Sequence, residues 1–169
     1  ATKFMPLPWR WRGRALVAAL RDSLARLGLG RVDLYQIHWP FGPRPVEVWA
    51  GALADAVEAG LTRAVGVSNF SADQMARAHE VLAARGVALA SNQVEYNLLN
   101  RKVETNGVAS RCRDLGVTLI AYTPLAGGAL TGKYAAGDRP KGLRRFMMRQ
   151  FRGRGLAEIA PVVALLREI

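Results

Sequence analysis

Short apolar runs that resemble β-strands alternate with helical stretches along this chain, and the alternation keeps a nearly constant length. The runs end at polar or aromatic residues, namely Lys3, His38, Ser68, Gln93 and Tyr122. Consecutive ends lie about 25 to 35 residues apart, which is the length of one strand–helix unit. Repeats of this length indicate a parallel sheet covered by helices. The pattern therefore predicts an α/β fold with about five strand–helix units.

Two architectures fit this alternation: a doubly wound open sheet and a (β/α)8 barrel. A complete barrel takes about 250 residues, whereas this chain has 169. A barrel would therefore be a partial (β/α)8 TIM barrel. The helices follow from apolar spacing, from a capping box at Ser71 and Gln74, and from glycines at helix ends. They are expected at residues 14–27, 45–59, 71–84, 102–115 and 156–169, the last interrupted by Pro161.

The composition excludes several classes of protein. Half of the residues are hydrophobic, which is typical of a globular protein and not of a disordered one. The single cysteine, Cys112, cannot form an intramolecular disulfide. One cysteine and two histidines without paired spacing also argue against a structural zinc site. No apolar run reaches the roughly 18 residues of a membrane span, so no transmembrane segment is predicted.

The net charge is +11, from 24 lysines and arginines against 13 acidic residues. Such a balance permits binding to phosphates, nucleic acid, acidic proteins or an anionic membrane surface. A chain rich in alanine, glycine and arginine can equally reflect coding bias. The charge alone does not choose between these interpretations.

A basic loop is expected at residues 136–155. Its segment KGLRRFMMRQFRGR, residues 141–154, contains no acid. One interpretation is a solvated loop with a few packed apolar side chains. The other is a docking segment for an anionic protein or a larger complex. Nucleic acid is a third partner that basic–aromatic interleaving suits, although no RNA-binding fold supports it. The cations of the segment are Lys141, Arg144, Arg145, Arg149, Arg152 and Arg154.

The predicted strands all end in side chains that can do chemistry or bind a ligand. In a parallel barrel the carboxyl ends of the strands share one face, where active sites are built. One histidine at a strand end is more often structural, but five such ends in a row favour a functional site. The sequence has no G-x-S-x-G elbow, no Walker P-loop and no G-x-G-x-x-G after a strand.

Four segments carry a resemblance to a known family. They are DLYQIHWP (33–40), AVGVSNFS (64–71), SNQVEYNLL (91–99) and GVTLIAYTPLAGGALTGKY (116–134). Together they resemble the aldo-keto reductases, in the order of that family, over residues 1 to about 135. The opening ATKFMPLPWRWR resembles chloroplast members from plants and green algae, including the pyridoxal-reductase-like ones. The resemblance implies one aldo-keto reductase domain over residues 1–169, incomplete at both ends, with strands three to seven of the barrel. The resemblance also implies a chloroplast location. Without the resemblance, a cytoplasmic location would be expected.

The resemblance implies a reaction and a set of roles. Family members transfer a hydride from NADPH to an aldehyde or ketone, and a tyrosine donates the proton. Lys3 matches the lysine that tunes this tyrosine, and His38 matches the histidine that orients the carbonyl. Trp39 would line the entrance for a small carbonyl substrate. The nicotinamide carboxamide would be bound by residues that match Ser68, Asn69 and Gln93. Tyr122 matches the aromatic residue that stacks on the nicotinamide ring. The loop along the pyrophosphate would contain Thr123, Pro124, Leu125, Gly127 and Lys133.

The same resemblance implies that some functional groups lie outside these residues. The family tyrosine and its aspartate come before residue 1, and the group that binds the 2′-phosphate comes after Ile169. The 169 residues alone are therefore expected to bind NADPH weakly and not to be competent as a catalyst. Two functions stay open. The first is an NADPH-dependent reductase, present here as a partial chain. The second is a pseudoenzyme: a non-catalytic subunit derived from a reductase, which binds a partner through its basic surface.

Overall fold

The computed structural model describes residues 1–10, 12–41, 44–135, 137–138, 140–143, 146 and 148–168. The chain divides into two compact units. The first unit contains Ala1–Val94 and Lys102–Ile120, and the second contains Glu95–Arg101 and Ala121–Ile169.

A five-stranded sheet forms the framework, with each strand beside the next one in the sequence. In a doubly wound sheet the strand order reverses at a switch point, whereas consecutive order is that of a (β/α)8 barrel. The described strands therefore form part of a barrel. This order decides between the two architectures that the alternation left open and confirms the partial barrel implied by the family resemblance. The strands are β1 (Thr2–Phe4), β2 (Val32–Ile37), β3 (Thr62–Ser68), β4 (Leu89–Glu95) and β5 (Thr118–Tyr122).

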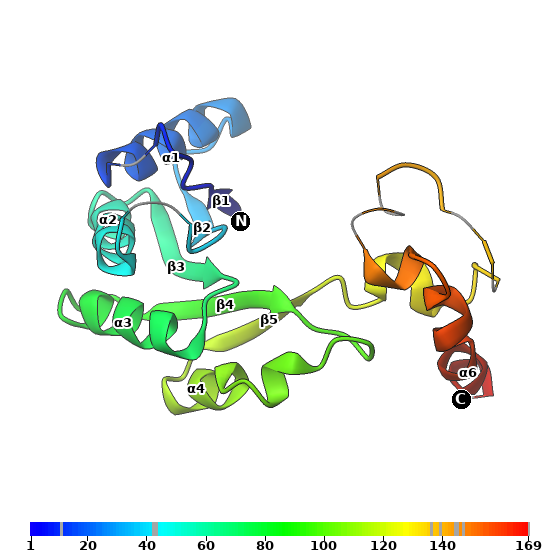
Figure 1. Cartoon of the computed structure of the whole chain (residues 1–169). Helices are drawn as coiled ribbons and strands as arrows, with labels where there is room; N and C mark the ends of the chain where they lie inside the picture. Colours follow the sequence, from blue (N-terminus) through cyan, green and yellow to red (C-terminus); the bar gives the residue numbers. More distant parts are fainter. Residues whose placement is uncertain are drawn as a thin grey trace. The chain divides into compact units, whose positions relative to one another are not determined.

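The helices of the first unit cover one side of this sheet, as Figure 1 shows for α1, α2 and α3. Helix α1 (Arg14–Leu27) has the predicted bounds and ends at Gly28, whose φ of 65° lies in the left-handed region. Helix α2 is Val46–Glu58, and α3 is Ala72–Ala83. The predicted capping box of α3 is confirmed, since Gln74 N–H donates to Ser71 Oγ at 3.2 Å and Ser71 N–H donates to Gln74 Oε1 at 3.0 Å.

The single helix predicted for residues 102–115 is wrong. The structure has a 3₁₀ turn, η1 (Lys102–Glu104), followed by α4 (Val108–Asp114). Gly107 separates them with a φ of 83°, a conformation that ends a right-handed helix. The Asn106 side chain accepts the backbone N–H of Val108 at 3.2 Å. The two helices are distinct because Asn106 and Gly107 form a turn between them.

The described part of the second unit contains short 3₁₀ turns and helix α6. The loop expected to lie along the pyrophosphate contains η2 (Ala126–Thr131), which bends at Gly127 and Gly128. Within the predicted basic loop, η3 (Arg149–Phe151) is a 3₁₀ turn, so that stretch is not wholly a loop. Residues 136, 139, 144, 145 and 147 of that prediction lie outside the described residues. The core of the unit consists of Ala126, Ala129, Leu130, Phe151 and Leu156.

Helix α6 (Gly155–Glu168) closes the second unit and corrects a further prediction. The helix was expected to be interrupted at Pro161, but it runs through this residue. A proline inside a helix removes one hydrogen bond, here to the carbonyl of Ala157, and tends to bend the helix. Pro161 is exposed, so water can reach the carbonyl that lacks its partner.

Candidate active site

Strand register places the predicted site residues of the first unit in rows across the sheet. Phe4 pairs with Ile37 and Val67 pairs with Asn92, and all four side chains are buried. This row faces the helices, since the Phe4 ring lies 5.4 Å from that of Trp49 in α2. Successive side chains alternate between the two faces of a strand. Residues one step before and one step after this row therefore point to the opposite face.

The opposite face carries the predicted catalytic and binding residues. Ser68 pairs with Gln93 one step after the buried row, and His38 follows Ile37 in the same way. Lys3 pairs with Gln36 one step before it. The structure thus brings Lys3, His38, Ser68 and Gln93 to one face, near the carboxyl ends of their strands. Tyr35 faces the other way and donates its hydroxyl hydrogen to the Leu16 carbonyl at 2.9 Å.

His38 is half-buried, and two contacts fix its backbone. Its N–H donates to the Phe4 carbonyl at 2.8 Å, and its own carbonyl accepts Asn69 Nδ2 at 3.4 Å. Burial, and then the positive charge of Lys3, lower the pKa of the imidazole below its usual value. A neutral imidazole carries one N–H donor and one acceptor nitrogen. His38 can therefore donate a hydrogen bond to a carbonyl oxygen while staying uncharged.

Lys3 supplies a charge close enough to affect His38. Burial lowers the pKa of its ammonium group, because an ion is less stable away from water. An ammonium group beside a reacting carbonyl stabilises negative charge that develops on the oxygen. Lys3 and His38 together form a pair of donors suited to a polarised carbonyl.

Asn69 lies at a strained position directly after β3. Its φ of 61° is in the left-handed region, which asparagine tolerates better than most residues. Its N–H donates to the Gln93 carbonyl at 2.9 Å, and its Nδ2 donates to Ser68 Oγ at 3.0 Å. Ser68 Oγ in turn donates to the Gln93 carbonyl at 2.8 Å. Ser68, Asn69 and Gln93 therefore form one connected group.

Trp39 follows His38 and lies partly exposed. Its ring stacks on Phe41, with ring centres 5.2 Å apart and planes only 4° from parallel. Phe41 keeps 57% of its surface exposed. The pair presents a flat aromatic surface in the loop after β2.

The remaining predicted cofactor residues belong to the second unit. Burial, followed by the negative charge of Glu95, raises the pKa of Tyr122. Thr123 has a φ of 55°, and its carbonyl accepts Ala126 N–H at 2.9 Å. Pro124 and Leu125 are exposed, and Gly127 is half-buried. Lys133 is exposed and has its ammonium nitrogen 5.1 Å from the centre of the Tyr134 ring.

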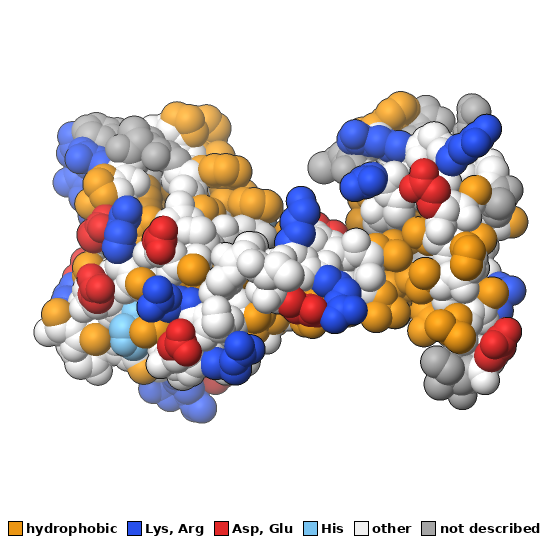
Figure 2. Space-filling view, turned by 60° about the horizontal axis from the view of Figure 1, so that its bottom comes forward, with side chains coloured by type: hydrophobic (Ala, Val, Ile, Leu, Met, Phe, Trp, Pro, Cys, Tyr) orange, Lys and Arg blue, Asp and Glu red, His pale blue; other side chains and the backbone are white. Residues whose placement is uncertain are grey.

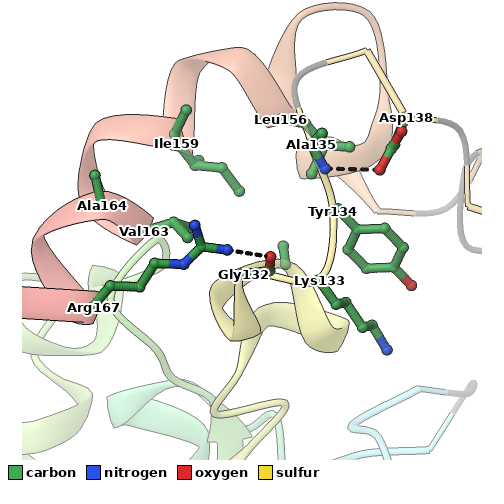
Figure 3. A pocket seen from close by; sticks show the side chains of 12 residues that line it. Gly132, Lys133, Tyr134, Ala135, Asp138, Leu156, Ile159, Val163, Ala164 and Arg167 are labelled. Atoms are coloured by element: carbon green, nitrogen blue, oxygen red, sulfur yellow. Dashed lines mark hydrogen bonds between the residues drawn. The ribbon is translucent and has the colours of Figure 1, made fainter.

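A cavity of about 340 Å³ lies beside this loop in the second unit. Its polar side chains are engaged with backbone groups: Arg167 Nη2 donates to the Gly132 carbonyl at 2.6 Å, and Asp138 accepts Ala135 N–H at 2.7 Å. Figure 3 shows the Lys133 side chain pointing away from Arg167. These groups do not converge on a common point, so the cavity is a weaker candidate than the strand ends.

Three buried polar residues, Gln36, Ser91 and Asn97, were missed by the sequence interpretation. Gln36 is buried, and its Nε2 donates to Ser91 Oγ at 3.3 Å and to the Val67 carbonyl at 3.4 Å. Asn97 is also buried, and its Nδ2 donates to the Thr123 carbonyl at 3.1 Å. Their signal in the sequence is an amide or hydroxyl within a strand or just after it, where an apolar residue is the norm.

The donor set fits an organic cofactor better than a metal ion. Among the residues that the structure describes, no three His, Cys, Asp or Glu side chains are grouped so that they could hold a metal. A primary amide such as that of Asn69 or Gln93 offers both a donor and an acceptor. This is the complement of a carboxamide.

In the described part of the chain, no helix has the length and apolarity needed to cross a membrane.

Comparisons with known proteins identify the family of this chain. The sequence model of the aldo/keto reductase family matches residues 1–165. The chain therefore belongs to the aldo/keto reductase family, and its five parallel strands are part of a (β/α)8 barrel.

Individual relatives cover the chain to different extents. The chloroplastic pyridoxal reductase of Arabidopsis thaliana is 40% identical over 173 residues, which is all of this chain and 46% of that protein. L-glyceraldehyde 3-phosphate reductase of Escherichia coli (strain K12) is 42% identical over 122 residues, 72% of this chain and 35% of that protein. The glycerol dehydrogenase AKR11B4 from Gluconobacter oxydans superimposes with a TM-score of 0.81 at 31% identity, covering 93% of this chain and 46% of that chain. The chain thus spans less than half the length of these relatives.

Proposed function

We propose that this protein is an oxidoreductase that reduces aldehyde or ketone carbonyls with NADPH. The observation that carries the proposal is the placement of Lys3 and His38 on one face of the sheet, close enough for the Lys3 charge to lower the His38 pKa. The relatives named as reductases support the same class of reaction. The dependence on NADPH follows from the usual cofactor of the family.

Each described residue has a physical role in such a reduction. His38 would donate a hydrogen bond to the carbonyl oxygen and orient the carbonyl group. Lys3 would stabilise negative charge on that oxygen and lower the pKa of a phenol beside it. Trp39 would exclude water from one side of the substrate. NADPH, when bound, would supply the hydride, and Ser68, Asn69 and Gln93 would hold its carboxamide.

The proposal is tested by following NADPH oxidation in the whole protein with an aldehyde substrate. His38→Ala and Lys3→Met should each lower kcat/KM by about 10²- to 10⁴-fold, because each supports proton transfer. His79→Gln is the matched control, since it changes the other histidine, in α3, and should leave kcat/KM unchanged. Full activity in both site variants would remove these roles.

A non-catalytic interaction subunit remains the second candidate. Lys141, Arg149, Arg152 and Arg154 are exposed, as are Leu143 and Phe146. An exposed basic segment with apolar side chains suits an acidic protein partner. This candidate requires the purified native protein to carry a stoichiometric partner that high salt releases. A monomer with full reductase activity would contradict it.

A chloroplast location is proposed from the chloroplastic pyridoxal reductase that matches the whole chain. Cell fractionation followed by immunoblotting would test it, and the protein should be enriched in the chloroplast fraction. Recovery in the cytosolic fraction alone would contradict the location.

A further inference from the structure

Asn92 is a polar residue in a row of the sheet that is otherwise apolar. It lies in β4 beside Val67, in the row that faces the helices, and it is fully buried. The other members of this row are Phe4, Ile37 and Val67. A buried amide is costly unless it is hydrogen-bonded, and an apolar side chain is the norm at such a position. The partners of Asn92 therefore indicate what this amide does.

The Asn92 side chain binds both backbone groups of Phe70, which follows the end of β3 by two residues. The Phe70 N–H donates to Asn92 Oδ1 at 3.4 Å, and Asn92 Nδ2 donates to the Phe70 carbonyl at 3.0 Å. The same Nδ2 lies 3.7 Å from Met75 Sδ in α3. An amide side chain offers the donor and the acceptor of a peptide group. Asn92 therefore holds Phe70 as the backbone of a paired strand would.

Phe70 stands between two residues with special backbone roles. Asn69, before it, has a φ of 61°, a left-handed conformation that a residue with a Cβ atom keeps only where its surroundings require it. Ser71, after it, is the N-cap of α3. By holding Phe70, Asn92 fixes the turn in which Asn69 takes up its strained conformation.

Asn92 also directly precedes Gln93 in the chain. The Gln93 carbonyl accepts the Asn69 N–H at 2.9 Å and Ser68 Oγ at 2.8 Å. Strand β4 thus binds the turn after β3 twice, through the side chain of one residue and the carbonyl of the next. These contacts determine how Asn69 lies relative to Gln93.

Helix α3, which follows this turn, has anchors of its own. Its side chains Ala78 and Leu82 are buried. On the surface, Arg77 of α3 pairs with Glu47 of α2, with 2.7 Å between Nε and Oε1. Figure 2 likewise shows acidic and basic side chains lying next to one another on the first unit. Loss of the Asn92 bonds should therefore loosen the turn without releasing the helix.

We infer that Asn92 is a positioning residue for the nicotinamide carboxamide. Its side chain lies on the helix side of the sheet, so it acts through the backbone of Phe70 and not by contact with the cofactor. It holds Asn69 where its amide and that of Gln93 can bind one carboxamide together. This inference rests on the proposed NADPH-dependent function and adds a residue that determines how the cofactor is held.

Binding measurements in the whole protein test this role without requiring turnover. Asn92→Leu keeps a similar size and removes both bonds to Phe70. It should raise the Kd for NADP⁺ by about five- to thirtyfold, as expected when one or two hydrogen bonds that order the site are lost. The Kd for adenosine 2′,5′-bisphosphate, which lacks the nicotinamide, should stay unchanged. Calorimetric titration measures both ligands.

A cofactor analogue tests the carboxamide directly. 3-Acetylpyridine adenine dinucleotide phosphate has a methyl group in place of the carboxamide NH₂, so it cannot donate a hydrogen bond there. The wild-type protein should bind NADP⁺ more tightly than this analogue, and Asn92→Leu should lose most of this preference. A merely structural role would weaken the binding of both ligands equally.

Two further variants control for a general loss of stability. Val65→Ala is the matched control, because Val65 is buried in β3 and pairs with Tyr35 and Leu89, away from the turn. It should destabilise the protein and leave the preference for NADP⁺ over the analogue unchanged. Asn92→Ser is too short to bind both groups of Phe70 and should behave like Asn92→Leu, also if the leucine variant does not fold. An unchanged preference in Asn92→Ser, or the same loss in Val65→Ala, would overturn the inference.

The outcomes separate this inference from the proposed function. If the protein binds NADP⁺ with the expected dependence on Asn92 but reduces no aldehyde, the reductase function fails and the positioning role stands. If it reduces aldehydes and Asn92→Leu binds both cofactors as the wild type does, the reductase function stands and the positioning role fails. A wild-type protein that does not bind NADP⁺ would remove both.

Discussion

At the scale of single residues, His38 shows how position changes the chemistry of a side chain. It follows the last residue of β2, where the sheet face opposite the helices becomes accessible. Burial and the Lys3 charge both disfavour the imidazolium form. The position at a strand end was predictable from the sequence. Burial is the larger cause of the lowered pKa, and the second cause, the Lys3 charge, comes from β1, a segment more than 30 residues away.

The first prediction concerns the titration of His38. Its pKa should lie below the usual value of about 6.5, and Lys3→Met should raise it, because one of the two causes is removed. In the window between the lowered folded pKa and 6.5, the unfolded chain binds more protons than the folded one. The free energy of unfolding should therefore rise with pH there, and stability should be lost as the pH falls through the window.

Nuclear magnetic resonance of the two histidine side chains measures this pKa directly, with His79→Gln to assign the signals. Arg26→Met serves as the control, since Arg26 lies in the last turn of α1. It removes one positive charge without changing the neighbours of His38. An unchanged His38 pKa in Lys3→Met would contradict the electrostatic contact.

At the scale of elements, the β3–β4 pair depends on a glycine in the middle of a strand. Gly66 pairs with Gln36 on one side and with Ser91 on the other. A Cβ atom on Gly66 would lie 2.3 Å from Ser91 Oγ and 3.0 Å from the Ser91 carbonyl oxygen. The absence of a side chain leaves room for the hydrogen bond between Gln36 and Ser91. A glycine in a strand often marks such a close approach.

Gly66→Ala should lower the free energy of unfolding by about 1–3 kcal/mol, because it overpacks a buried site. Adding Ser91→Ala should restore part of this loss, since the closest clashing atom is removed. Gly51→Ala is the control: it lies in α2 with no atom within 4 Å of the added Cβ, so it should stabilise by about 0.4–1 kcal/mol. Urea denaturation measures all three, and a neutral Gly66→Ala would contradict the close approach.

At the scale of the whole molecule, each of the two units has its own apolar core. In the first unit Leu16, Leu20 and Leu24 of α1 are buried. In the second unit the core around Phe151 and Leu156 includes an edge contact of 5.3 Å between the rings of Tyr134 and Phe151. Units with separate cores can open separately, and hydrogen exchange then reports different stabilities.

Leu156→Ala should speed amide exchange in η2, η3 and α6, because deleting a buried leucine side chain costs about 2–5 kcal/mol. Exchange in α1 and α2 should stay unchanged. Leu20→Ala, in the core of the first unit, should give the reverse pattern. Hydrogen exchange with mass spectrometry measures both variants. A uniform rise across the chain in either variant would show that the two units open together.

The sequence by itself determined the elements whose energetics are local. The bounds of α1, the capping box at Ser71 and the strand–helix alternation follow from neighbours within a few residues. The turn at Asn106 and Gly107 is also local, since this dipeptide favours a turn. The helix through Pro161 depends on packing of α6 in its own unit, which local propensity does not contain.

Only the tertiary structure decided the order of the strands and the groups that meet on the sheet face. Both an open sheet and a barrel satisfy the same alternation, and they differ only in which strands pair. The Gln36–Ser91 bond joins residues 55 positions apart, and the charge of Lys3 reaches His38 through the pairing of β1 with β2. Such contacts depend on register and burial across the whole sheet. They arise from long-range packing, which no local pattern of residues specifies.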